Sequence, residues 1–308
     1  MGIDRRTMLK SAAVAGATAL VRASPLPARE RRTAPSNAVG MLYDATLCIG
    51  CKACMVACKE ANGDPADTRT PGMKNYDAPT DLNDRTRTII KQFADGDQRS
   101  FVKMQCMHCI DPACAAACML GALEKRDFGV VTWDPDLCIG CRYCQVACPF
   151  NVPKFEWESA TPSIVKCEMC SDRLAEGNEP ACCEACPRGA AIFGERADLL
   201  RIAHGRIRQH PDRYYPKVYG ETELGGTQVL VLSAVPFEKI GLLHEDEEPV
   251  PHLQQTIQHG IYKGFVAPAA LYAVLGGVML RHRRVSQING SGDSPASVEE
   301  ATDKEAIR

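Results

Sequence analysis

The sequence has no excess of either charge and none of the common catalytic motifs. Its 308 residues carry 36 Lys and Arg against 38 Asp and Glu, a formal net charge of −2, which excludes nucleic-acid binding through bulk positive charge. It contains no G-x-G-x-x-G, no P-loop, no H-E-x-x-H and no G-x-S-x-G, so nucleotide-binding, zinc-protease and serine-hydrolase sites are not indicated. Its seven histidines are scattered. The sequence therefore predicts a protein that performs no substrate chemistry of its own.

Cysteine, in contrast, is abundant, with 17 in the chain. All but Cys183 fall into four groups, which we number one to four in chain order. The groups are Cys48, Cys51, Cys54 and Cys58; Cys106, Cys109, Cys114 and Cys118; Cys138, Cys141, Cys144 and Cys148; and Cys167, Cys170, Cys182 and Cys186.

The repeated spacing distinguishes between three roles for these cysteines. A disulfide scaffold has no reason to repeat one spacing, and a four-cysteine zinc site needs only two C-x2-C pairs. The spacing C-x2-C-x2-C-x3-C suits a 4Fe–4S cluster, because three cysteines on one loop reach three iron corners and the fourth binds the other cluster of a pair. Gly50 and Gly140 stand where such a loop turns tightly. We therefore expect the four groups to bind four 4Fe–4S clusters as iron ligands.

The residue after the fourth cysteine supports the same interpretation. Pro149 and Pro187 occupy this position in groups three and four, as in bacterial ferredoxins. Groups one and two depart from the pattern with Lys59 and Met119.

The fourth cysteines also predict how the groups pair. The connection between groups two and three is about that of a two-cluster ferredoxin, so Cys118 is expected at the cluster wrapped by group three and Cys148 at the cluster wrapped by group two. Groups one and four then pair across this insertion. Cys58 is expected at the group-four cluster and Cys186 at the group-one cluster.

One ligand of group four has two candidates, the adjacent Cys182 and Cys183. The other groups separate their third and fourth cysteines by three residues. Because Cys186 precedes a proline and takes the fourth position, this spacing selects Cys182. Cys183 is then expected to be a small buried apolar residue.

Strand patterns flank these groups. Residues 87–93 and 100–104 predict a β-hairpin with Asp95-Gly96 in its turn, and 130–133 and 226–233 predict short strands. The expected fold class is α+β: two ferredoxin-like two-cluster units, one inserted in the other, plus one C-terminal transmembrane helix. The cluster domain is expected over residues 29–258.

The N-terminus has the three regions of an export signal. Arg5-Arg6 with Leu9-Lys10 resembles a twin-arginine motif, an apolar run follows at Ser11–Val21, and small residues stand at Ala23 and Ala28. We expect residues 1–28 to be this signal.

The C-terminal region contains an uncharged segment, Gly264–Leu280, followed by the basic residues Arg281–Arg284. Because positive charge stays on the cytoplasmic side, residues 259–284 predict a single-pass anchor with the main domain outside. Residues 285–308 are polar and predict a disordered cytoplasmic tail.

The stretches GMLYDATLCIGCKAC, KMQCMHCIDPAC, CRYCQVACPFNVPK and YGETELGGTQVLVL resemble the four-cluster subunits of membrane hydrogenases and molybdenum oxidoreductases, and the uptake-hydrogenase members most of all. The resemblance covers the chain from about Gly40 to the apolar C-terminal segment.

The resemblance implies a non-catalytic electron-transfer subunit on the periplasmic side of the inner membrane. Its partners would be the small and large subunits of a nickel–iron hydrogenase and a quinone-linked integral membrane subunit. The alternatives are the equivalent subunit of a formate dehydrogenase or another molybdenum oxidoreductase and, in a different class, a non-redox zinc-binding protein.

Overall fold

A computed structural model describes residues 32–66, 79–95, 98–159, 162–243, 247–251 and 266–290. The chain divides into two compact units, one of residues Pro27–Thr256 and one of Met1–Leu26 with Ile257–Arg308. The predicted export signal and the predicted Gly96 turn lie outside the described residues. As predicted, the chain combines helices and strands.

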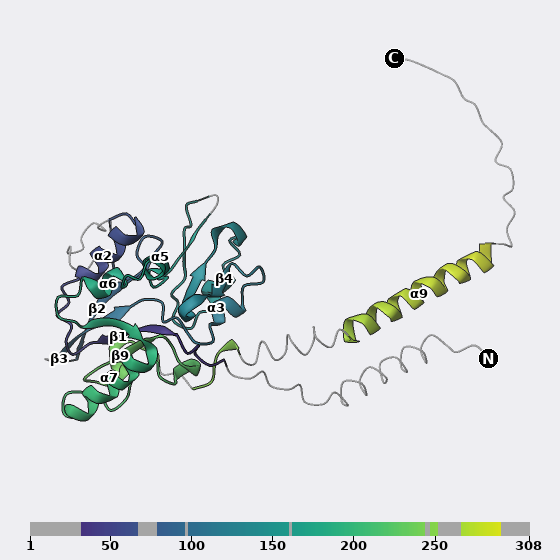
Figure 1. Cartoon of the computed structure of the whole chain (residues 1–308). Coiled ribbons are helices and arrows are strands. Elements are labelled where there is room, and N and C mark those ends of the chain that lie inside the picture. Colours follow the sequence, from purple (N-terminus) through teal and green to yellow (C-terminus); the bar gives the residue numbers. More distant parts are fainter. Residues whose placement is uncertain are drawn as a thin grey trace, which may run out of the picture. The chain divides into compact units, whose positions relative to one another are not determined.

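A three-stranded sheet lies at the base of the larger unit (Figure 1). Its central strand, β1 (Val39–Asp44), pairs antiparallel with β8 (Ala191–Glu195) and parallel with β9 (Val229–Leu232). The predicted strand at 226–233 is therefore present as β9. This sheet joins the part of the chain before the first cysteine group to the parts after the last.

The two faces of β1 have different neighbours. Met41 and Tyr43 belong to the core cluster that includes several of the cysteines, whereas Leu42 packs in a second cluster with Leu199 of α7 (Arg196–Gln209). In Figure 1, α7 lies on one side of the sheet, and the short helices near the cysteines lie on the other. Because both faces are covered, β1 is apolar along most of its length rather than alternating.

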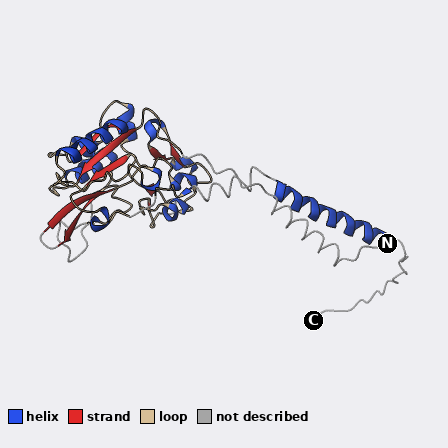
Figure 2. Ribbon diagram, turned by 90° about the horizontal axis from the view of Figure 1, so that it is seen from below, coloured by secondary structure: helices blue, strands red, loops and turns tan. Residues whose placement is uncertain are grey.

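Three two-stranded hairpins complete the strands of this unit (Figure 2). The predicted first hairpin is confirmed, and its strands pair from Ile89–Met104 to Asp95–Gln98. The hairpins are β2 (Ile89–Asp95) with β3 (Gln98–Met104), β4 (Leu123–Lys125) with β5 (Val131–Trp133), and β6 (Lys154–Phe155) with β7 (Ile164–Val165).

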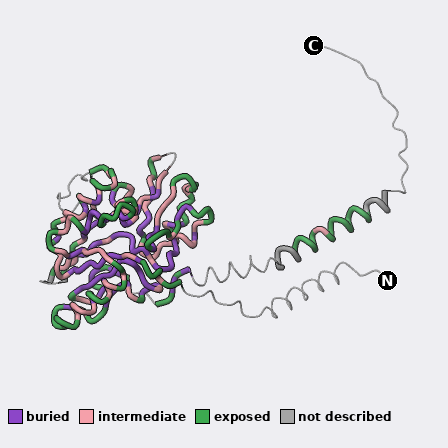
Figure 3. The backbone as a smooth tube through the Cα atoms, viewed as in Figure 1, coloured by how far each residue is buried: buried purple, intermediate pink, exposed green. Residues whose placement is uncertain are grey.

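Short helices begin inside the cysteine groups. Helix α2 (Ala53–Asn62) packs against α6 (Ala181–Glu184), and α3 (Ala113–Ala116) packs against α4 (Tyr143–Ala147). Helix α5 (Ser171–Ala175) follows Cys170. Short 3₁₀ turns occur at Asp127–Gly129, Pro135–Leu137, Glu223–Gly225 and Phe237–Ile240. Figure 3 shows buried backbone running through the middle of this unit, where these helices meet the strands.

The predicted transmembrane anchor is not supported. Helix α9 (Val266–Gly290) is the described part of the smaller unit, and no helix among the described residues is both long and apolar enough to cross a membrane. Its uncharged stretch ends at Leu280, where the four basic residues begin. The helix also continues through the first residues of the predicted disordered tail, because no glycine or proline interrupts that part of it before Gly290.

Candidate metal centres

The cysteines gather into four sets, and each set combines three cysteines of one group with one cysteine of another. We call them sites 1 to 4 after the group that supplies the three. Site 1 is Cys48, Cys51, Cys54 and Cys186; site 2 is Cys106, Cys109, Cys114 and Cys148; site 3 is Cys118, Cys138, Cys141 and Cys144; site 4 is Cys58, Cys167, Cys170 and Cys182. These are the sets that the predicted pairing gives. Ligation of iron by these cysteines stays a prediction.

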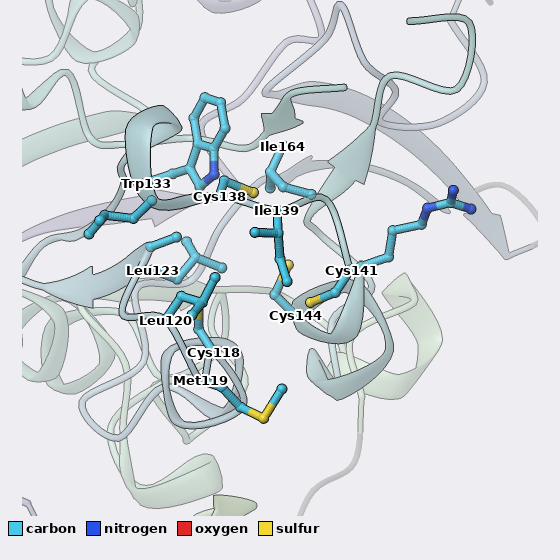
Figure 4. A pocket seen from close by; sticks show the side chains of 13 residues that line it. Cys118, Met119, Leu120, Leu123, Trp133, Cys138, Ile139, Cys141, Cys144 and Ile164 are labelled. Carbon is cyan, nitrogen blue, oxygen red and sulfur yellow. The ribbon is translucent and has the colours of Figure 1, made fainter. Parts of the chain in front are cut away.

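Site 3 is a pocket lined mainly by apolar side chains (Figure 4). All four of its cysteines line the same hollow, together with Leu123, Trp133 and Ile164. Cys141 is exposed, whereas Cys144 is buried. The pocket therefore opens to the surface through the loop that carries Cys141.

Sites 1 and 4 are neighbours because helix α2 serves both. The helix carries Cys54 of site 1 and Cys58 of site 4, which are four residues apart and so about one helical turn apart. Helix α6 supplies Cys182 to site 4, and Cys186 follows it into site 1. The packing of α2 against α6 thus fixes the distance between the two sites.

Sites 2 and 3 are linked in the same way through α3, which carries Cys114 and is followed by Cys118. Site 2 also adjoins site 4, since Cys106 is close enough to Cys167 to raise its pKa, although burial is the larger cause. The four sites therefore follow one another in space in the order 1, 4, 2, 3.

The turns that wrap the sites are alike. In each group, the residue before the second cysteine has a positive φ: Gly50 (69°), His108 (48°), Gly140 (68°) and Met169 (53°). The sequence indicated this turn at the two glycines. It carried no such signal at His108 and Met169, whose side chains are buried at 0% and 1% exposure.

Backbone N–H groups point at the cysteine sulfurs, as a negatively charged cluster requires. The amide of Gly50 donates to Cys48 Sγ (3.4 Å), that of Met169 donates to Cys167 Sγ (3.3 Å), and that of Ala190 donates to Cys186 Sγ (3.2 Å). Such donors stabilise a thiolate over a thiol. Four soft sulfur donors from cysteine at each site, with N–H groups aimed at the sulfurs of sites 1 and 4, fit 4Fe–4S clusters.

Burial acts in the opposite direction on most of these thiols. It raises the pKa of Cys54 to about 11 and that of Cys58 to about 12. Since iron binds the thiolate, loading these sites releases protons and leaves negative charge in the interior. No three Cys, His, Asp or Glu side chains in the described part of the chain are grouped so as to hold a single metal ion.

The structure separates the two adjacent cysteines of group four. Cys182 lines site 4, whereas Cys183 is not among the residues that line it. The thiol of Cys183 donates a hydrogen bond to Cys182, which lowers the pKa of Cys182 to about 6 and raises that of Cys183. The geometry thus agrees with the C-x3-C spacing.

Comparisons with known proteins lead to the same chemistry. A family model described as a 4Fe-4S dicluster domain matches residues 98–196. The chain is 36% identical to the Hydrogenase-2 operon protein HybA of Escherichia coli O157:H7 over 329 aligned positions, which cover 94% of this chain and 99% of that protein. The chain belongs to the HybA family.

Two further relatives align with a smaller share of the chain. A protein of Nitratidesulfovibrio vulgaris Hildenborough is 47% identical over 79% of this chain and 68% of its own length. The iron-sulfur subunit of the nitrate-inducible formate dehydrogenase of E. coli K12 is 36% identical over 73% of this chain and 72% of its own. This HybA-family chain is therefore an iron–sulfur electron-transfer subunit of an oxidoreductase complex, and not the catalytic component.

Sequence reasoning missed two buried lysines near the sites of this HybA-family chain. Lys103 and Lys166 are 4% and 1% exposed. The available signal for Lys103 was a single lysine in the apolar strand FVKM, directly before group two. The exposed Arg142 lies over the rings of Phe155 and Trp157, at 4.4 and 4.0 Å from their centroids.

Proposed function

We propose that this chain relays electrons through four 4Fe–4S clusters, one at each site, between a nickel–iron hydrogenase and a quinone-linked integral membrane subunit. The observation that carries the proposal is the exposure of the two end sites. Cys51 of site 1 and Cys141 of site 3 are exposed, whereas sites 4 and 2 lie between them and are built mainly from buried cysteines. A row of sites that is open at both ends and covered in the middle suits entry and exit of electrons at different partners.

The sixteen cysteines of the four sites would hold the clusters, which supply one-electron carriers when bound. The chain's own residues do three things. They bind iron through thiolates, they aim backbone amides at the sulfurs, and they exclude water from the interior sites. The arrangement of α2 with α6 and of α3 with α4 supports two ferredoxin-like units, one inserted in the other.

The experiment is anaerobic purification of the full chain, followed by iron and sulfide analysis and EPR of the dithionite-reduced protein. Four clusters correspond to about sixteen irons and sixteen sulfides per chain. A colourless protein that binds zinc without sulfide would overturn the proposal in favour of the zinc-binding alternative.

The hydrogenase partner is supported by the HybA relative, which aligns over nearly the whole chain. The formate dehydrogenase subunits support a second candidate, the equivalent wire of a molybdenum enzyme. Purification of the tagged chain from its own cells separates the two, because nickel in the co-purified complex indicates hydrogenase and molybdenum indicates the second candidate.

We further place the protein at the inner membrane, with the cluster domain on the periplasmic side. The twin-arginine signal in residues 1–28 supports export of a domain that folds around its clusters in the cytoplasm. Arg5→Lys with Arg6→Lys is expected to leave the brown protein in the cytoplasm. Periplasmic brown protein from the double variant, expressed without its partner subunits, would contradict this placement.

Attachment at the membrane is assigned to the C-terminal segment. Helix α9 exposes Leu271, Leu275 and Met279 at 59%, 50% and 72%, and basic residues follow them, which supports contact with an anionic membrane. A chain truncated before Val266 is expected to stay brown and move to the soluble fraction. A truncated chain that remains with the membranes without partner subunits would show that this segment is not the attachment.

A further inference from the structure

Lys103 is a buried cation without a carboxylate partner in the described part of the chain. It stands on β3 and is 4% exposed. Two other lysines are held differently: the buried Lys166 lies 3.7 Å from Glu168, and the half-buried Lys125 donates to the carbonyl of Cys109 and to Gln228. A buried charge is strongly unfavourable unless opposite charge or hydrogen bonds compensate it.

The side chain of Lys103 has three acceptors, which is the number of donors on an ammonium group. Its Nζ donates to Thr88 Oγ1 and to Gln105 Oε1, and the third partner is the sulfur of Cys182. Thr88 and Gln105 are themselves buried, at 2% and 3% exposure. A neutral amine has only two N–H donors, so this set of partners favours the charged form.

The position of Lys103 connects two sites. It lines the pocket of site 1, and its charge acts on Cys54 of that site. It also acts on Cys58 of site 4 and hydrogen-bonds Cys182 there. With clusters bound, the negative charge that compensates Lys103 would come from the ligating cysteines and the clusters of both sites.

We propose that Lys103 is a fixed positive charge between sites 1 and 4 that raises the reduction potentials of the clusters held there. This inference rests on the proposed function, because it requires clusters at both sites. Each cluster gains one electron on reduction, and a cation in a low-dielectric interior stabilises that added charge without any proton transfer. The clusters at sites 1 and 4 would therefore have higher reduction potentials than the cysteine ligands and the backbone N–H groups alone would give them.

The test is an EPR-monitored redox titration of the full-length chain carrying Lys103→Met, which removes the charge and keeps an unbranched side chain. Two of the four midpoint potentials are expected to fall. At a fixed potential near the original midpoints, the ratio of reduced to oxidised cluster is expected to drop about tenfold or more at those two sites. Lys103→Arg, which keeps the charge, is expected to restore both potentials toward the original values.

Lys91→Met is the matched control. Lys91 lies on β2 of the same hairpin, directly opposite Val102, and its partly exposed side chain pairs with Asp81 at 3.1 Å. The same loss of charge there is expected to leave all four potentials nearly unchanged, because solvent screens it. Equal shifts in Lys91→Met and Lys103→Met would show a general charge effect and would overturn the inference.

Gln105→Glu decides the question if Lys103→Met does not assemble its clusters. This change keeps Lys103 and the side-chain size but places a negative charge against the ammonium. The same two potentials are expected to fall, and unchanged potentials in a variant with full iron content would overturn the inference. Fewer than four clusters in the unaltered protein would instead overturn the proposed function, and iron and sulfide analysis separates that result from a failure of the inference.

Discussion

The same turn occurs in the loops of all four sites, but the terminal sites 1 and 3 and the interior sites 4 and 2 place different residues at it. The terminal loops both read CIGC and turn at Gly50 and Gly140, and their isoleucines are exposed at 56% and 70%. The interior loops read CMHC and CEMC and make the same turn at His108 and Met169, whose side chains are buried.

This difference shows how a strained turn is stabilised in two environments. A non-glycine residue in the left-handed region costs about 1–2 kcal/mol. Burying a methionine side chain gains about 1.5–3 kcal/mol, so Met169 offsets its strain by packing. The exposed loops have no comparable packing, and glycine avoids the strain there. The terminal loops remain accessible to partners, whereas the interior loops form part of the core.

The largest expected effect comes from removing equivalent cysteines at an interior and a terminal site. Cys109→Ala is expected to lose the site 2 cluster and most of the folded protein, because Cys109 is less exposed than Cys141 and its site lies among core residues. Cys141→Ala, the matched change at site 3, is expected to retain the other three clusters and a near-normal yield, because water can reach that corner. Iron content, EPR and the yield of brown protein measure both. Equal losses would remove the distinction between interior and terminal sites.

The adjacent cysteines of site 4 give the next largest effect. Cys182→Ala is expected to lose or convert one cluster, a fall of up to about a quarter of the iron. Cys183→Ala should keep all four clusters, because the Cys183 thiol only donates a hydrogen bond to Cys182. This variant tests the contribution of the Cys183 side chain to packing. Iron analysis and EPR on the two variants decide the assignment. The reverse pattern would place the ligand one residue later.

Metal removal compares the terminal and interior sites by the rate at which their clusters are lost. Treatment of the oxidised protein with ferricyanide and a chelator is expected to bleach the clusters in two phases, with sites 1 and 3 reacting first. Cys141 and Cys51 are exposed, and solvent-accessible thiolate sites react sooner. Stopped-flow absorbance gives the phases, and Cys141→Ala should reduce the amplitude of the fast one. A single phase for all clusters would contradict the burial difference.

The smallest effect concerns the turn itself. Gly140→Ala places a side chain at φ 68° against Pro162 at 3.4 Å and is expected to destabilise the protein by about 1–2 kcal/mol. Gly205→Ala in α7 is the control, because its position is open and has no positive φ; it is expected to stabilise by about 0.5–1 kcal/mol. Thermal unfolding of the two holoproteins compares them, and equal effects would show that the turn carries no strain.

The cysteine spacing predicted which cysteines share a site. It did not predict which other residues are buried around the sites. The C-x3-C interval places Cys54 and Cys58 one turn apart along α2, so they can reach two adjacent sites. Hairpin β2–β3 was predictable because two short segments with apolar residues flank an Asp-Gly pair. Such local rules need no knowledge of tertiary contacts.

The remaining features depend on contacts between distant parts of the sequence. The burial of Lys103 depends on Thr88 across the hairpin and on Cys182, far along the chain. The turn at Met169 depends on a core that closes over it. The C-terminal membrane span was inferred from an uncharged segment and the basic residues that follow it. No described helix is long and apolar enough to cross a membrane, and α9 continues through those basic residues to Gly290.

The crossed supply of ligands has a consequence for the order in which the protein is made. Sites 2 and 3 draw all their cysteines from residues 106–148, whereas sites 1 and 4 each combine cysteine from before residue 60 with cysteine from after residue 180. During synthesis from the N-terminus, the middle pair is complete while the outer pair still lacks its last ligand. Cluster insertion can therefore begin at sites 2 and 3, and sites 1 and 4 are both complete only once Cys186 has left the ribosome.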